Sequence, residues 1–217
     1  MRVHSARERR GGFTLIEVLL SVAILGSLLG TVFLVQRQGE RAAHSGNAQL
    51  QANLKAARVV DRVVRELQGM GGDGATPSQA TALGTDTLTF QVSEGVDAGA
   101  VDWSTPRRLE LQMAPGEADN GLDDDLDGLI DERALVLTLD LGSGDQRSTI
   151  LCAELRELFP GETENALDDD GNGVADERGF NLHRTGDVLE VRVCVEQPGP
   201  EGSLVTASVE TSFRVRN

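Results

Sequence analysis

The chain has 217 residues, with 20 Lys and Arg against 35 Asp and Glu, so its formal net charge is −15. This acidic balance argues against a protein that binds nucleic acid mainly through phosphate contacts, because such binding requires a basic face. Only two cysteines are present, which excludes a Cys-rich zinc module and a small disulfide-dense scaffold.

The chain starts with a basic segment that is followed by a long apolar run. Residues 1–12 carry four arginines and one glutamate, and residues 13–35 hold a single charged residue, Glu17. A helix over this run would reach roughly 34 Å, enough to cross the hydrocarbon core of a membrane. The alternative is a buried helix of a soluble protein, which the basic flank disfavours. No A-x-A cleavage pattern follows Val35, so we expect the apolar helix to stay on the mature protein.

The junction GGFTLIEVLLSVAIL resembles the prepilin signature of type IV pilins and type II secretion pseudopilins. The resemblance implies that a prepilin peptidase cuts after Gly12 and that the new N-terminal residue, Phe13, is N-methylated. It also implies that Glu17 pairs with the N-terminal amine of a neighbouring subunit, which neutralises two charges inside an apolar bundle. The alternative is a Glu17 that is solvated near the membrane interface. The implied partners are other pilin or pseudopilin subunits, the peptidase and the inner-membrane assembly platform.

We expect the helix to continue outside the membrane over residues 37–68, which contain no proline. Apolar residues recur there at steps of three or four and predict a stripe that packs on a sheet, formed by Leu50, Leu54, Ala57, Val60, Val64 and Leu67. A glycine-rich linker over 69–85 would end the helix. The helix end and the TDTLTF sequence that follows it also resemble the PilW and GspJ minor subunits.

Residues 86–217 predict a β-rich globular domain. Alternating patterns predict strands at Thr87–Val92, Arg108–Met113, Ala134–Leu141, Val188–Val195 and Leu204–Val215, while Thr149–Phe159 fits a strand or a helix. The expected fold class is α+β, with an antiparallel sheet of about four to six strands that packs one face on the long N-terminal helix. The N-terminal part would then comprise a leader at 1–12, a membrane or filament-core helix at 13–36 and its periplasmic continuation.

Two acidic segments repeat one another at an offset of 45 residues. NGLDDDLDGLIDER at 120–133 and NALDDDGNGVADER at 165–178 share the asparagine, the Leu-Asp-Asp-Asp run, the glycine and the closing Asp-Glu-Arg. We call residues 117–133 the first acidic loop and residues 162–178 the second acidic loop. Acidic side chains at alternate positions before a glycine resemble a calcium loop of the EF-hand type, because every second side chain can turn toward one ion.

The candidate ligands are oxygen donors only, which favours calcium or magnesium over zinc, and the crowded geometry favours calcium. They are the side chains or carbonyl groups of Asp123, Asp125, Asp127, Leu129, Asp131 and Glu132 in the first loop, and of Asp168, Asp170, Asn172, Val174, Asp176 and Glu177 in the second. The EF-hand's closing glutamate is missing, since Ala134 and Gly179 stand in its place. The first copy is similar to the metal-binding repeats of MopE-like surface proteins, which implies two weak calcium sites. The alternative is a pair of solvated turns.

The two cysteines, Cys152 and Cys194, follow the membrane helix and would therefore face an oxidising compartment. This favours a disulfide that encloses the second acidic loop, and two buried free thiols are the alternative. The sequence contains no nucleophile–base set and no phosphate loop, so we do not expect an enzyme.

The sequence thus predicts a minor pilin or pseudopilin subunit of a type IV pilus or a type II secretion filament. It would act by assembly, at the initiation or the tip of the filament, with calcium stabilising its globular domain. Before assembly it would be a single-pass protein of the inner membrane with a periplasmic domain, and afterwards part of a periplasmic pseudopilus or a cell-surface pilus. The second hypothesis is a calcium-dependent adhesive module that uses a pilin-type anchor for display.

Overall fold

The structure is a computed structural model that describes residues 12, 14–71, 75–76 and 84–215. By contact density the chain divides into two compact units, residues 1–44 and 45–217. The elements in chain order are α1 (Leu15–Leu67), β1 (Thr87–Phe90), β2 (Ser93–Asp97), β3 (Ala100–Trp103), β4 (Arg107–Met113), β5 (Arg133–Leu139), β6 (Arg147–Leu155), β7 (Phe180–Thr185), β8 (Val188–Pro198), the 3₁₀ helix η1 (Pro200–Gly202) and β9 (Leu204–Arg214).

Helix α1 runs without a break from Leu15 to Leu67 and so joins the two segments that the sequence predicts as helical, 13–36 and 37–68. No proline interrupts its 53 residues, so the ladder of backbone hydrogen bonds is not broken. The helix ends where glycines begin: Met70 donates its N–H to the carbonyl of Leu67 at 3.0 Å, next to Gly69 and Gly71. Single glycines are tolerated within α1, but several close together favour a helix end because each loses more backbone entropy in a helix than other residues do.

The face of α1 that packs on the sheet is rotated from the predicted stripe. Of the predicted stripe, Val60 and Leu67 are buried, but Leu50 and Leu54 are 56% and 47% exposed. The buried helix residues are Ala52, Ala56, Val59, Val60, Val63 and Leu67. The two alanines, Ala52 and Ala56, are the first of these residues along the chain, and both are completely buried. The leucines one row away are left at the outside of the contact.

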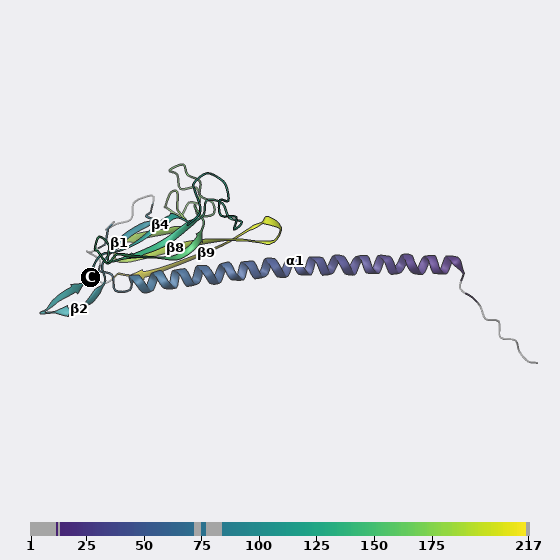
Figure 1. The fold of residues 1–217 in the computed structure, drawn as a ribbon, viewed down its shortest axis with the longest axis horizontal. Coiled ribbons are helices and arrows are strands. Elements are labelled where there is room, and N and C mark those ends of the chain that lie inside the picture. The colour runs from purple at the N-terminus through teal and green to yellow at the C-terminus, as the bar shows by residue number, and fades with distance from the viewer. Residues whose placement is uncertain (1–11, 13, 72–74, 77–83, 216–217) are drawn as a thin grey trace, which may run out of the picture. The chain divides into compact units, whose positions relative to one another are not determined.

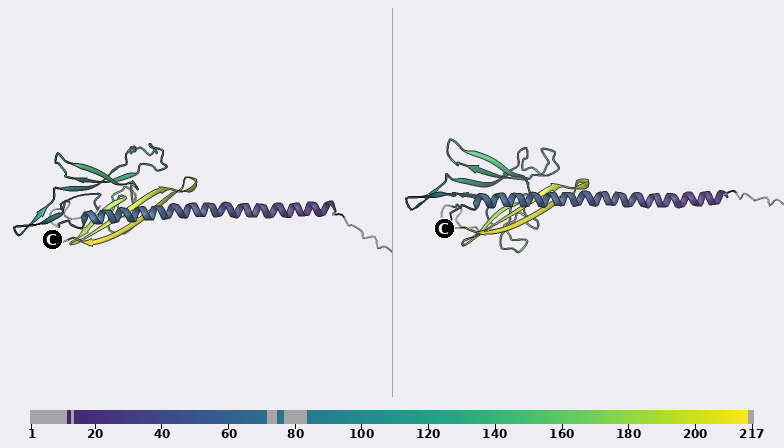
Figure 2. Two further views of the ribbon diagram at one scale, coloured as in Figure 1. Left: turned by 60° about the horizontal axis from the view of Figure 1, so that its bottom comes forward. Right: turned by 90° about the horizontal axis from the view of Figure 1, so that it is seen from below.

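The sheet is antiparallel and has seven strands within the described residues, in the order β1-β4-β5-β6-β8-β7, with β9 paired to β8 (Figures 1 and 2). A second, two-stranded sheet is formed by β2 and β3. The α+β prediction is confirmed, and segment 149–159 is strand in its first part. The sheet has one strand more than the upper end of the predicted range of four to six, because β7 was not expected: its FNLHRT sequence is short and mostly polar.

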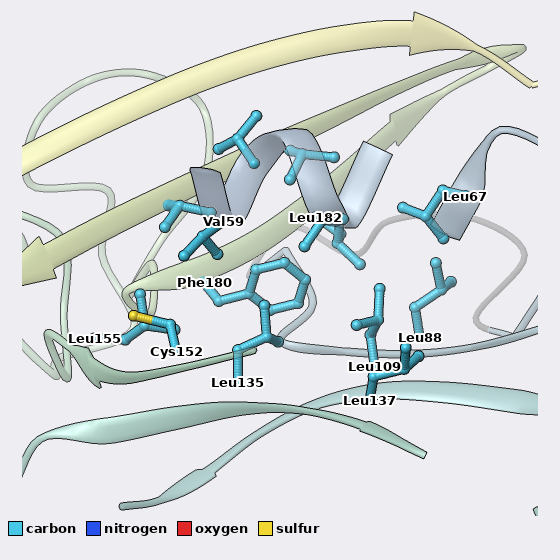
Figure 3. Close-up of a cluster of buried hydrophobic side chains, with 14 of the residues drawn as sticks. Val59, Leu67, Leu88, Leu109, Leu135, Leu137, Cys152, Leu155, Phe180 and Leu182 are labelled. Carbon is cyan, nitrogen blue, oxygen red and sulfur yellow. The ribbon is translucent and has the colours of Figure 1, made fainter. Parts of the chain in front are cut away.

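The core lies between the sheet and the C-terminal part of α1. Figure 3 shows Val59 of the helix at the end of the core with Phe180 and Leu155, and Leu67 at the other end with Leu88 and Leu109, all of them buried. Complete burial of each such side chain contributes about 1.5–3 kcal/mol. Along β5, odd-numbered Leu135 and Leu137 join this core, whereas Ala134 and Val136 form a small cluster with Ala114. Successive strand residues point to opposite faces, so the two clusters lie on opposite faces of the sheet.

Candidate functional site

The N-terminal end of α1 carries the predicted processing and assembly residues. Gly12 is exposed, whereas Phe13 and the residues before Gly12 lie outside the described residues. In the first helical turn, Oε2 of Glu17 accepts hydrogen bonds from the N–H and the hydroxyl of Thr14, both at 2.9 Å. The N–H of Glu17 donates back to the Thr14 hydroxyl at 3.3 Å. These bonds form a capping box, so in the single chain Glu17 caps its own helix.

The first half of α1 presents an apolar surface to its surroundings. Its large hydrophobic side chains from Leu15 to Val35 are 49% to 79% exposed. No part of this apolar segment is buried, and among the described residues α1 is the one helix that is long and apolar enough to cross a membrane. An apolar surface of this extent is typical of a segment that lies in lipid or packs on other helices.

Each acidic loop connects two strands of the same sheet, which pair directly at the first loop and lie on either side of β8 at the second. The first loop lies between β4 and β5, and the second lies between β6 and β7. Each loop is closed at its base by the same backbone hydrogen bond: Ala114 N–H donates to the Glu132 carbonyl at 3.1 Å, and Phe159 N–H donates to the Glu177 carbonyl at 2.8 Å. The sequence repeat is therefore also a repeat of backbone structure.

Backbone positions in the left-handed region recur at the same offset. The positive φ angles of Gly128 and Gly173 are 96° and 94°, and those of Asp131 and Asp176 are 52° and 50°. At a further matched position, the first loop has Leu126 at φ 65°, where the second loop has a glycine. A residue with a side chain costs about 1–2 kcal/mol in this conformation. The two loops thus share one backbone path although their residues differ.

Three predicted ligands of the first loop meet around its turn. Carboxylate oxygens of Asp123, Asp125 and Asp127 lie within 4.8 Å of one another. The N–H of Asp127 donates to Asp123 and Asp125 at 3.1 and 3.0 Å, and the N–H of Gly128 donates to Asp123 at 3.0 Å. The side chain of Leu129 is completely buried and fixes this part of the loop to the protein interior. The turn therefore holds the three carboxylates together.

The second loop repeats this turn with one fewer acid. The N–H of Asn172 donates to Asp168 and Asp170 at 3.1 and 3.0 Å, and the N–H of Gly173 donates to Asp168 at 2.8 Å. Val174 is buried in the position that Leu129 has in the first loop. Asn172 replaces the third aspartate, so the turn carries two carboxylates instead of three.

The first residue of each acidic loop is a glutamate that the sequence analysis did not propose as a ligand. Glu117 accepts the N–H groups of Asp124 and Asp125, both at 3.0 Å, and one of its oxygens lies within 4.8 Å of oxygens of Asp125 and Glu132. Glu162 has the same place in the second loop, where it meets Asp168 and Asp170. The signal was present in the sequence, because a Pro-Gly-Glu triplet begins both copies at the same offset of 45 residues.

The carboxylates of Asp131 and Asp176 lie outside these acidic groups. Asp131 accepts the N–H groups of Asn120 and Gly121 at 3.0 and 2.8 Å. Asp176 makes the matching contacts 45 residues later, with Asn165 and Ala166. Both aspartates therefore tie the start of a loop to its end.

The buried glutamates that close the loops have different surroundings. Glu132 is 3% exposed, and its Oε2 has no hydrogen-bond partner. Burial, together with the charges of Asp127, Glu117 and Asp125, raises the pKa of Glu132 to about 7. Glu177 is completely buried, but its Oε1 pairs with the Arg192 guanidinium at 2.7 Å.

The residues of the first loop fit a calcium ion. Glu117, Asp123, Asp125, Asp127 and Glu132 supply hard oxygen donors from one side of a tight turn, and a buried carboxylate oxygen among them is unsatisfied. Calcium takes six to eight such oxygens in irregular geometry. Bound there, it would neutralise carboxylates that otherwise repel one another.

An ion-pair network joins the bases of the two loops. Oε1 of Glu157 pairs with Arg133 at 2.6 Å and with Arg178 at 3.1 Å. Arg133 also pairs with Asp119, and Arg178 with Glu164, which is the equivalent residue of the second loop. The shared glutamate places the two loop bases side by side at one edge of the domain.

The expected disulfide between Cys152 and Cys194 is not formed in the structure, where both are buried free thiols. Cys152 belongs to the main core, as do Val193 and Val195 on β8. Cys194 lies between these two valines on β8 and therefore points to the opposite face of the sheet. Burial raises the pKa of the Cys152 thiol to about 12.

Comparison with known proteins gives one finding, at the N-terminus. Residues 7–33 match the family model of the prokaryotic N-terminal methylation motif. No curated protein and no solved structure matches the chain.

The match covers the segment in which α1 begins and in which Glu17 lies. It implies processing by a prepilin peptidase and assembly with other pilin subunits, and it points to a structural subunit rather than to an enzyme. Together with the exposed apolar helix, it indicates a membrane-anchored protein. These findings support a type IV pilin-like or pseudopilin-like protein that carries a prepilin-type N-terminus.

Proposed function

We propose that the chain is a minor subunit of a type IV pilus or a type II secretion filament, and that it acts by assembly at the initiation or the tip. The observation that carries the proposal is the methylation motif at residues 7–33, which runs into an apolar helix whose side chains are exposed from Leu15 to Val35. Such a surface needs lipid before assembly and neighbouring helices after it.

Glu17 has a specific place in this proposal. It is the single charged residue of the apolar run, and in the single chain its carboxylate is held by Thr14. Removal of residues 1–12 would create a free amine four residues before Glu17. In a filament, the amine of a neighbouring subunit would satisfy this carboxylate where no water can, and would thereby set the axial stagger.

The acidic loops supply the second part of the proposal, in which calcium stabilises the globular domain. An ion that binds the folded loops but not the unfolded chain adds stability by mass action, about 1.4 kcal/mol at ten times its Kd. We expect a Kd on the order of 10⁻⁴–10⁻³ M, as in other extracellular modules.

Intact-mass measurement of the chain isolated from membranes tests the first part. With a prepilin peptidase present, we expect the loss of residues 1–12 and one added methyl group on Phe13. The variant Gly12→Val should keep the leader, because a β-branched side chain would replace the glycine at the cleavage point, and Gly11→Val is the matched control. A wild-type chain that keeps its leader, or that loses the apolar helix together with it, would exclude the proposal.

A further inference from the structure

Two glutamates at equivalent positions near the ends of the acidic loops, Glu132 and Glu177, are both buried. They differ in the charged and polar groups that surround their carboxylates. Glu132 is 3% exposed and Glu177 is 0% exposed, and each closes its loop through the same backbone hydrogen bond. A buried carboxylate is tolerated only when it has a counter-charge or hydrogen-bond donors. The partners of the two side chains therefore show whether each loop requires a cation from outside the chain.

Glu177 is satisfied by groups of the chain itself. The guanidinium of Arg192 on β8 reaches Oε1 of Glu177 at 2.7 Å, and the side-chain amide of Asn172 donates to its Oε2. Arg192 is held in place by Glu190 at 2.6 Å and by Glu210 at 3.3 Å. The chain itself thus supplies a cation to Glu177, from β8.

Glu132 has none of these partners. Its Oε2 accepts no hydrogen bond, and among the described residues it makes no ion pair. The position of Asn172 is taken by Asp127, whose ionised side chain cannot donate a hydrogen bond. Arg133, the next residue in the chain, directs its guanidinium to Glu157 and Asp119 instead.

The surroundings of Glu132 are themselves acidic. One oxygen each of Glu117, Asp125 and Glu132 lies within 4.8 Å of the others, and Asp125 also belongs to the group with Asp123 and Asp127. Two groups of three carboxylates that share Asp125 therefore lie at this turn, one of them contains the buried Glu132, and no cation of the described residues pairs with Glu132. Hard oxygen donors in this number are the ligands of a divalent cation of the calcium type.

We infer that the two copies of the repeat have diverged: the first acidic loop is the divalent-cation centre, with Glu117, Asp125 and Glu132 at its buried end, whereas Arg192 takes the place of the ion under the second loop. The inference rests on the calcium part of the proposed function and assigns it to one loop. In this assignment Glu117 and Glu132, near the two ends of the first acidic loop, are ligands of the ion and replace the missing closing glutamate of an EF-hand.

Calorimetric titration of the full chain in detergent with CaCl₂, together with melting curves in EGTA and in CaCl₂, tests this assignment. Glu132→Gln keeps the shape of the side chain and removes its charge. We expect calcium binding to weaken by about tenfold or more in this variant, because the number of charged ligands sets the affinity. In EGTA its melting temperature should exceed that of the wild type, because a buried unpaired charge is gone.

Glu177→Gln is the matched control at the equivalent position. It should melt below the wild type both in EGTA and in CaCl₂, because Arg192 loses its buried partner, and it should keep the calcium affinity of the wild type. If this control does not fold, Asp168→Asn serves in its place, and Glu117→Gln repeats the test in the first loop.

The outcomes separate the inference from the proposal on which it rests. Calcium binding that is lost in Glu132→Gln and kept in the second-loop variant supports the assignment. Wild-type affinity in Glu132→Gln, or an equal loss in both loops, would overturn the assignment and leave the calcium role intact. A wild-type chain that neither binds CaCl₂ nor melts higher in its presence would overturn both.

Discussion

At the scale of single residues, several side chains have a partner within the chain and a second partner that only an assembly or a ligand can provide. Glu17 is bonded to Thr14 in the single chain, and the proposed assembly would give its carboxylate the amine of another subunit. A capping residue and an assembly residue are thus the same side chain, and their effects can be separated by substitution.

Glu17→Ala should insert into the membrane normally but enter filaments poorly, because its carboxylate is gone. Thr14→Ala removes the other half of the capping box at a cost of about 1 kcal/mol in helix stability and keeps the carboxylate. We therefore expect Thr14→Ala to assemble. The measurement is the amount of each variant in sheared filaments relative to the membrane fraction, and equal loss of both variants would reduce the role of Glu17 to capping.

The thiols provide a second residue-scale test. Burial raises the pKa of Cys152 to about 12, so this thiol stays protonated at neutral pH, and the thiolate is the reactive form. We expect iodoacetamide to leave Cys152 unlabelled in the folded chain and to label both cysteines once the chain is unfolded without reductant. Mass spectrometry after unfolding would contradict the structure if it showed the two cysteines joined by a disulfide.

At the scale of elements, the acidic loops show how one backbone path accepts different residues. Leu126 is 86% exposed at a positive φ of 65°, so it gains little from packing and has an unfavourable conformation. The second loop has Gly171 at this position, with φ 78°. The matched backbone shows that a glycine can be accommodated there.

Leu126→Gly should therefore stabilise the domain by about 0.5–1 kcal/mol, which is the relief of left-handed strain less the entropy that glycine loses on folding. Leu126→Ala keeps the side-chain strain and serves as the control, with little expected change. Chemical denaturation in EGTA measures both. A Leu126→Gly variant that unfolds more readily than the wild type would show that the leucine contributes a contact outside the single chain.

At the scale of the whole molecule, the question is whether the acidic loops serve the stability of the subunit or the binding of another molecule. Their bases are joined through Glu157, and they connect strands of the same sheet that packs on the C-terminal part of α1. Loss of the ion should thus lower the stability of the globular domain of the subunit.

Replacement of residues 115–131 by Asn-Gly, combined with Glu132→Gln, would close β4 and β5 with a tight hairpin and remove the first loop. If calcium stabilises the subunit, we expect this variant to be insensitive to EGTA in melting curves, to melt below the calcium-loaded wild type and to form fewer filaments. An adhesive role would show as a loss of surface attachment at normal filament number. A variant that forms no filaments although it folds would assign the loop to a contact between subunits.

Much of the architecture could be predicted from local patterns. The apolar run, the glycine-rich stop after Leu67 and the alternation along the strands each depend on near neighbours in the chain, so the helix and five strands were found where the structure has them. The helix face was predicted less well, because the stripe in the sequence does not say that Ala52 and Ala56, rather than Leu50 and Leu54, meet the sheet.

By itself the sequence determined the prepilin-type start, the membrane-length helix and the existence of two matched acidic loops, because spacing and polarity along the chain are sufficient for these. Only the tertiary structure decided that Cys152 and Cys194 point to opposite faces and that Glu132 and Glu177 differ. The reason is physical: the charge that satisfies Glu177 comes from Arg192 on β8, and no local pattern around either loop records which distant side chain will lie beneath it.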